Sequence, residues 1–145
     1  MKKVYFTGHL RGFFKQIIDN PPDGYKYYKK ESLQYYETNS RMKLFAKKIF
    51  VSKLGDLLGL IIVKNMGDED KSYDLTISYN RFLNTNNNYM IVVENPTALY
   101  HYSLKRKDYF LGKKKIKNNI NKDNLKALIC ISKACRDTCR ELLNI

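Results

Sequence analysis

A turn that combines glycines with basic residues follows the first apolar run of the sequence. The run ends at Thr7, and the turn contains Gly8, His9, Arg11 and Gly12. Glycines permit a sharp turn into a helix start, where the free backbone N–H groups and Arg11 suit an anion. The spacing is not that of a dinucleotide-binding glycine motif, so a purely structural turn remains an alternative.

Two further groups of polar side chains follow two later apolar runs. One is Ser78-Tyr79-Asn80-Arg81, and the other is Glu94-Asn95-Pro96-Thr97. Ligands collect at the carboxyl ends of parallel strands, so we predict that Tyr79, Asn80, Glu94, Asn95 and Thr97 line one rim. These groups suit hydrogen bonding to sugar hydroxyls or phosphate, and Glu94 is a candidate base. In the competing interpretation Asn95 and Thr97 only complete a turn, and Glu94 pairs with a cation.

Ser132 follows a last apolar run, and it is placed to cap the helix predicted after it. Three cysteines lie nearby, Cys130, Cys135 and Cys139, without paired C-x-x-C spacing or a histidine cluster. Buried thiols are therefore the favoured interpretation, and we expect no metal site and no cofactor. The sequence also lacks a spacing specific enough to predict nucleophilic catalysis.

These candidates must be positioned by alternating strands and helices. The predicted strands cover residues 3–7, 25–29, 73–79, 89–93 and 125–131, and the predicted helices cover 11–18, 41–60, 104–119 and 133–143. Apolar strands that alternate with helices indicate a parallel sheet covered on both faces. We predict one domain, residues 1–145, with a Rossmann-like three-layer α/β sandwich and a mainly parallel sheet.

The net charge of +13 is concentrated in two segments, residues 26–53 and 103–126. Such segments favour contact with polyanions, which include anionic membranes, nucleic acid and phosphorylated substrates. The helix that begins at Arg41 combines a basic face with Phe45, Ile49 and Phe50, as interfacial helices do. We predict that it meets an anionic membrane through four lysines: Lys43, Lys47, Lys48 and Lys53. Alternatively, its apolar stripe packs on the sheet.

The composition points to the cytoplasm. Three clustered cysteines are not the disulfide framework of a secreted scaffold. The apolar run after Lys3 is too short for a signal peptide, and no apolar stretch approaches the length of a membrane span. A cytoplasmic location, with peripheral attachment to the inner face of the membrane, is expected.

Read in order, four segments resemble the N-terminal domain of group 1 glycosyltransferases, which have the GT-B fold. They are Val4 to Gly8 with its turn to Gly12, Tyr73 to Tyr79, Met90 to Pro96, and Ile129 to Cys135. The family pattern is an opening strand with a glycine turn, a middle strand, a strand ending before a polar-x-Pro element, and a strand ending in serine before a helix. Many relatives carry a histidine where this sequence has Glu94.

This resemblance implies the acceptor-binding half of a retaining enzyme that transfers a sugar from a nucleotide sugar to a lipid-linked or polysaccharide acceptor. It implies that the acceptor cleft is lined by the glycine turn and by the ends of the later strands: Gly8, His9, Arg11, Gly12, Tyr79, Asn80, Glu94, Asn95, Thr97 and Ser132. The donor half is expected to be missing, so that the nucleotide sugar binds only through the absent domain and the chain is inactive alone. A basic nucleic-acid-binding module, less favoured because no RNA or DNA motif is present, and a stand-alone α/β interaction domain are the alternatives.

Overall fold

Five parallel strands form the central sheet of the protein. The computed structural model describes residues 1–8, 12–29, 41–66 and 72–144, without the side chains of residues 13 and 41–44. The strands are β1 (Lys2–Thr7), β2 (Tyr25–Lys29), β4 (Leu75–Tyr79), β6 (Tyr89–Val93) and β7 (Leu125–Cys130). Their order is β2-β1-β4-β6-β7, and every neighbouring pair is parallel. The predicted Rossmann-like α/β fold is therefore confirmed.

Helices cover both faces of this sheet, because its strands are apolar on both sides. The flanking helices are α1 (Gly12–Asp19), α4 (Phe110–Ile120) and α5 (Lys133–Leu143). Phe14 of α1 packs with Val4 and Phe6 on one face of the sheet. On the other face, Ile116 of α4 and Cys139 of α5 belong to a larger buried cluster. The sheet is thus the middle one of three layers.

A second, two-stranded parallel sheet was not predicted. It consists of β3 (Val63–Asn65) and β5 (Phe82–Asn84), with Val63 opposite Phe82. Phe82 and Leu83 are completely buried in the larger cluster. Each strand has only three residues, too few for a recognisable alternation. The small sheet matters to the site because β3 carries Lys64.

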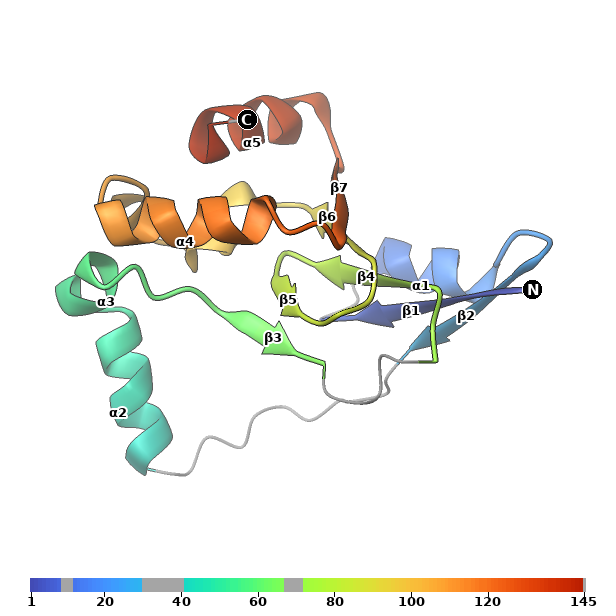
Figure 1. Cartoon of the computed structure of the whole chain (residues 1–145), viewed down its shortest axis with the longest axis horizontal. Coiled ribbons are helices and arrows are strands. Elements are labelled where there is room, and N and C mark those ends of the chain that lie inside the picture. The colour runs from blue at the N-terminus through green and yellow to red at the C-terminus, as the bar shows by residue number, and fades with distance from the viewer. Residues whose placement is uncertain (9–11, 30–40, 67–71, 145) are drawn as a thin grey trace.

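The basic helix predicted over residues 41–60 is in fact two helices, α2 (Arg41–Phe50) and α3 (Lys53–Leu57). The break falls at Ser52, whose hydroxyl donates to the Ile49 carbonyl at 2.7 Å and accepts from the Gly55 N–H at 3.3 Å. The hydroxyl thus closes one helix and caps the next. Figure 1 shows α2 and α3 at one end of the molecule, with α2 away from the sheet. The alternative that the apolar stripe of α2 packs on the sheet is wrong.

The helix predicted over residues 104–119 is also shorter than expected. Two 3₁₀ helices, η2 (Pro96–Tyr100) and η3 (Leu104–Lys107), precede α4. Arg106 at the end of this region is completely buried. Its guanidinium bonds to Asp56 of α3 at 3.0 Å and to the carbonyl oxygens of Phe50, Leu60 and Tyr100. A polar centre therefore joins α2, α3 and η3.

The prediction that residues 125–131 form a buried strand is right about the strand and wrong about burial. β7 is the edge strand, and Ile129 and Ile131 are 41% and 48% exposed. Helix α1 contacts β2, at the opposite end of the sheet, and is only eight residues long. It therefore does not cover the face of β7 on which the exposed Ile129 lies.

Candidate functional site

The order of the strands reverses between β1 and β4. The chain first adds β2 on one side of β1 and then crosses to place β4 on its other side. A crevice forms at the carboxyl ends of the strands at such a switch point, and ligands of doubly wound α/β proteins bind there. We call the row of carboxyl ends of β1, β4, β6 and β7 the rim. Its described residues are Thr7, Gly8, Tyr79, Asn80, Glu94, Asn95 and Ser132.

Gly8 lets the ends of β1 and β4 approach each other closely. Its φ is +121°, and a Cβ at this position would lie 3.1 Å from the Cβ of Tyr79. Both features require glycine, because a side chain would meet strain as well as a tight contact. Gly12 begins α1 and is exposed. His9 and Arg11, between these glycines, lie outside the described residues.

Asn80 joins the ends of β4 and β6. It is buried in the left-handed conformation, with a φ of 54°. Its carboxamide oxygen accepts the backbone N–H of Glu94 at 2.8 Å and that of Asn95 at 3.3 Å. This side chain thus replaces the backbone hydrogen bonds between β4 and β6 beyond the point where the strands separate. It fixes the positions of Glu94 and Asn95.

Tyr79 holds the Glu94 carboxylate on the rim. The tyrosine is buried, its ring meets Phe14 edge to face with centroids 5.3 Å apart, and its hydroxyl donates to Oε2 of Glu94. The hydrogen bond restricts the carboxylate to one orientation at the junction of β4 and β6. A half-buried carboxylate of fixed orientation can accept hydrogen bonds from a sugar hydroxyl.

Asn95 and Thr97 are committed to a local turn. The Asn95 side chain accepts the Thr97 backbone N–H at 3.0 Å and the Thr97 hydroxyl at 2.7 Å, which caps η2. The prediction that they complete a turn is confirmed. Their side chains therefore contribute to the shape of the rim, whereas Tyr79, Asn80 and Glu94 form its polar centre.

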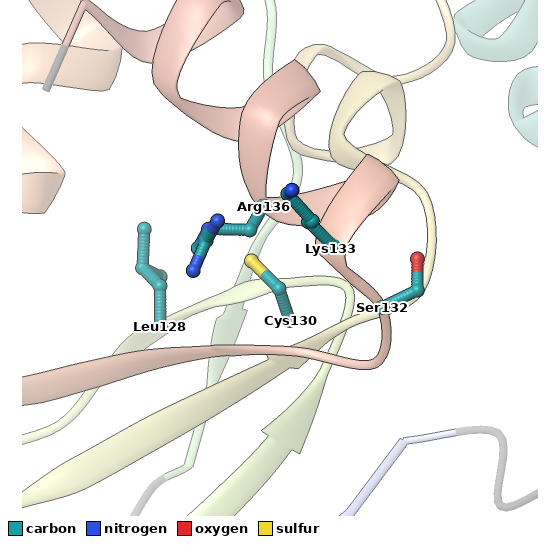
Figure 2. A pocket seen from close by; sticks show the side chains of 5 residues that line it. All are labelled: Leu128, Cys130, Ser132, Lys133 and Arg136. Atoms are coloured by element: carbon teal, nitrogen blue, oxygen red, sulfur yellow. The ribbon is translucent and has the colours of Figure 1, made fainter.

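Ser132 lies at the end of β7, where a pocket opens under α5. Its hydroxyl accepts the Cys135 N–H at 3.1 Å, so the predicted cap is confirmed. The pocket has a volume of about 440 Å³ and is lined by Leu128, Cys130, Ser132, Lys133 and Arg136. Figure 2 shows the Arg136 side chain between Leu128 and Cys130, with Ser132 at the start of the helix. This end of the rim is therefore basic.

The three cysteines are free thiols, Cys130 on β7 and Cys135 and Cys139 on α5. Burial raises the pKa of Cys139 to about 12, and the neighbouring Cys130 thiol adds to this shift. Burial also raises the pKa of Cys135, helped by Cys130 and by the charge of Glu94. The prediction of buried thiols is confirmed for Cys135 and Cys139, while Cys130 is half-buried. Across the described ranges, no three His, Cys, Asp or Glu side chains gather as a metal site would need.

Lys64 of β3 contacts the rim, which the sequence did not reveal. Its ammonium donates to the hydroxyl of Thr7, the last residue of β1. The contact spans 57 positions of the sequence and depends on β3, a strand too short to predict. It places a cation near the switch point. The only local sign of this strand end was the apolar run Leu60 to Val63, followed by Lys64 and a polar residue.

The predicted membrane lysines lie apart from the rim. Lys47 and Lys48 of α2 and Lys53 of α3 are exposed, whereas the side chain of Lys43 lies outside the described residues. Within the described parts of the chain, no helix has both the length and the apolar character needed to cross a bilayer.

Comparison with protein-family models, with curated proteins and with solved structures finds no match to this chain. The fold and the rim therefore define an α/β domain with a parallel five-stranded, Rossmann-like sheet.

Proposed function

We propose that this chain is the acceptor-binding half of a retaining glycosyltransferase. The observation that carries the proposal is the continuous rim, in which Asn80 and Tyr79 orient Glu94 and its neighbours at adjacent strand ends. The four segments that resemble group 1 glycosyltransferases lie on β1, β4, β6 and β7, so their carboxyl ends share one edge of the sheet. This common edge supports the resemblance because the four segments, which are separate in sequence, could then line one cleft together.

The chemistry of the rim suits a carbohydrate. A carboxylate, a carboxamide, hydroxyls and nearby cations offer both acceptors and donors to sugar hydroxyls. Lys64 at one end and Lys133 and Arg136 at the other add positive charge, which suits a phosphorylated acceptor. In this proposal the nucleotide sugar binds to a second lobe, and this chain alone neither transfers nor hydrolyses the sugar.

Saccharide binding tests the proposal directly. The chain is applied to an array of immobilised oligosaccharides, and backbone amide NMR spectra are then recorded with the saccharides that bind and with nucleotide sugars. We expect the saccharides to shift the amide signals of Asn80, Glu94 and Asn95, while nucleotide sugars leave them unchanged. Glu94→Gln should weaken saccharide binding about tenfold, because a charged acceptor is lost.

Glu141→Gln is the matched control, since Glu141 is exposed on α5. It should bind saccharides like the unaltered protein. Binding of nucleotide sugars at the rim without any saccharide binding would contradict the proposal, as would saccharide binding unaffected by Glu94→Gln.

A further inference from the structure

The two basic segments of the chain are adjacent in space although about 50 residues separate them in sequence. Helix α3, which begins at Lys53 where the first segment ends, packs against η3 and α4, from the second. Lys115 of α4 donates to the Leu58 carbonyl at 3.0 Å. A Cβ on Gly59 would lie 2.4 Å from the backbone nitrogen of Gly112, so the two backbones touch. The structure therefore brings the end of the first charged segment close to the second.

Apolar side chains that would normally be buried are exposed around this contact. We call their surface the docking face, and its six apolar members are Leu54, Leu57, Leu58, Leu104, Phe110 and Leu111. Phe110 is 73% exposed and Leu57 is 53% exposed. Leu57 and Leu58 directly precede Gly59, and Leu111 directly precedes Gly112. The backbone contact thus brings apolar side chains at the end of α3 close to those at the start of α4.

Lysines accompany these apolar side chains. Among the described side chains, the exposed lysines of α2, α3, η3 and α4 are Lys47, Lys48, Lys53, Lys105, Lys113, Lys114 and Lys117. The ammonium of Lys114 lies 5.9 Å from the centre of the Phe110 ring. The acid of α3, Asp56, is already paired with buried Arg106. The exposed acid Asp108 is a single negative charge among several lysines, so the surface is positive. Apolar groups among long cationic side chains match the boundary between lipid headgroups and acyl chains.

Two other occupants fit the docking face less well. A second copy of this chain in a twofold interface would bring lysines against lysines, which costs energy. Nucleic acid would satisfy the lysines, but non-specific binding to single strands uses aromatic stacking platforms. Here leucines outnumber the aromatic side chains, which are Phe110 and its neighbour Tyr109. An anionic bilayer satisfies the lysines and the leucines together.

We propose that the docking face binds the surface of an anionic membrane, with Phe110 and the leucines inserted among the lipids. The proposal extends the membrane contact expected of α2 to a composite surface centred on α3, η3 and the start of α4. It is independent of the glycosyltransferase assignment, because none of its residues lies on the rim.

Vesicle co-sedimentation tests this proposal with the whole chain. Vesicles of phosphatidylcholine alone are compared with vesicles of equal parts phosphatidylcholine and phosphatidylglycerol. We expect binding to the anionic vesicles only. The double variant Lys105→Glu, Lys114→Glu should reduce that binding by more than about tenfold, since each basic residue near the surface contributes about a fivefold effect. The double variant Leu57→Ser, Phe110→Ser should reduce it by about tenfold or more, because exposed side chains lose their apolar insertion.

Matched controls lie at the other end of the molecule. Lys2→Glu with Lys15→Glu makes the same change of charge on β1 and α1, and Ile17→Ser removes another exposed apolar side chain. Both controls should bind anionic vesicles within about twofold of the unaltered protein. Equal binding to both kinds of vesicle, full binding by the Leu57→Ser, Phe110→Ser variant, or binding to oligonucleotides without binding to vesicles would each overturn the proposal. Saccharide binding at the rim should be unchanged in every variant, so failure here does not affect the proposed function.

Discussion

The carboxamide oxygen of Asn80 accepts the backbone N–H of Glu94 at 2.8 Å, which links the ends of two neighbouring parallel strands through a side chain. Asparagine tolerates the left-handed backbone found here better than most residues do. The same oxygen also reaches the N–H of Asn95. The shape of the rim between β4 and β6 therefore depends on one residue.

Replacing Asn80 with alanine should lower the free energy of unfolding by about 1–3 kcal/mol. The partly buried N–H of Glu94 would lose its acceptor, and alanine would be strained at this positive φ. Asn80→Asp keeps the acceptor oxygen and should cost less. Urea unfolding of the three proteins at neutral pH measures the difference. Equal stability of Asn80→Ala and the unaltered protein would show that the bond does not hold the rim.

Gly8 and Gly12 should respond in opposite ways to the same substitution. Gly8→Ala should destabilise the fold by about 1–3 kcal/mol, because its φ is +121° and its new Cβ would press on Tyr79. Gly12→Ala should leave stability unchanged or raise it by up to about 1 kcal/mol, since no atom lies within 4 Å of the new Cβ. Thermal unfolding followed by circular dichroism measures both. Similar shifts in Tm for the two variants would contradict this explanation.

The main sheet was predictable because its information is local. Apolar runs of five or six residues, bounded by glycine, proline or polar turns, can be recognised as strands from the local sequence alone. Ser132 likewise signals its helix from one position, and the structure confirms the cap. The alignment of the four strand ends on one rim then follows from parallel topology alone.

The remainder depends on contacts between distant residues. Apolar spacing continues from Phe50 through Leu54, so the pattern favours one continuous helix even though Ser52 is a residue type that can cap a new one. The break is stabilised by buried Arg106, which bonds to the Phe50 carbonyl from 56 positions away. The exposure of β7 has the same kind of cause, because an edge strand is defined by what lies beside it. Lys64 reached the rim through a three-residue strand that no pattern marks.

The ion pair between Arg106 and Asp56 should be essential for stability. Asp56→Ala should cost about 3–5 kcal/mol, because it leaves a buried guanidinium without its counter-charge. Arg136 and Asp137 form a matched control pair that is half-exposed. Asp137→Ala should cost less than about 0.5 kcal/mol, as exposed pairs contribute little. Urea unfolding tests both variants, and comparable losses would mean that the buried pair is not a stabilising centre.

Stability should fall as the pH rises above about 9, and Cys139 should be one cause. Burial raises its pKa from the ordinary value of 9.0 to about 12, so the folded protein keeps a proton that the unfolded chain releases. This contribution is complete below pH 9 and is lost between about pH 9 and 12, at up to about 1.4 kcal/mol per pH unit. Cys139→Ala removes the titrating group, and the cost of its cavity does not vary with pH. We therefore expect the stability difference between the unaltered protein and Cys139→Ala to shrink from pH 8 to pH 10.5 in urea unfolding under reducing conditions. A difference that stays constant over this range would show that the folded protein does not hold Cys139 in its protonated form.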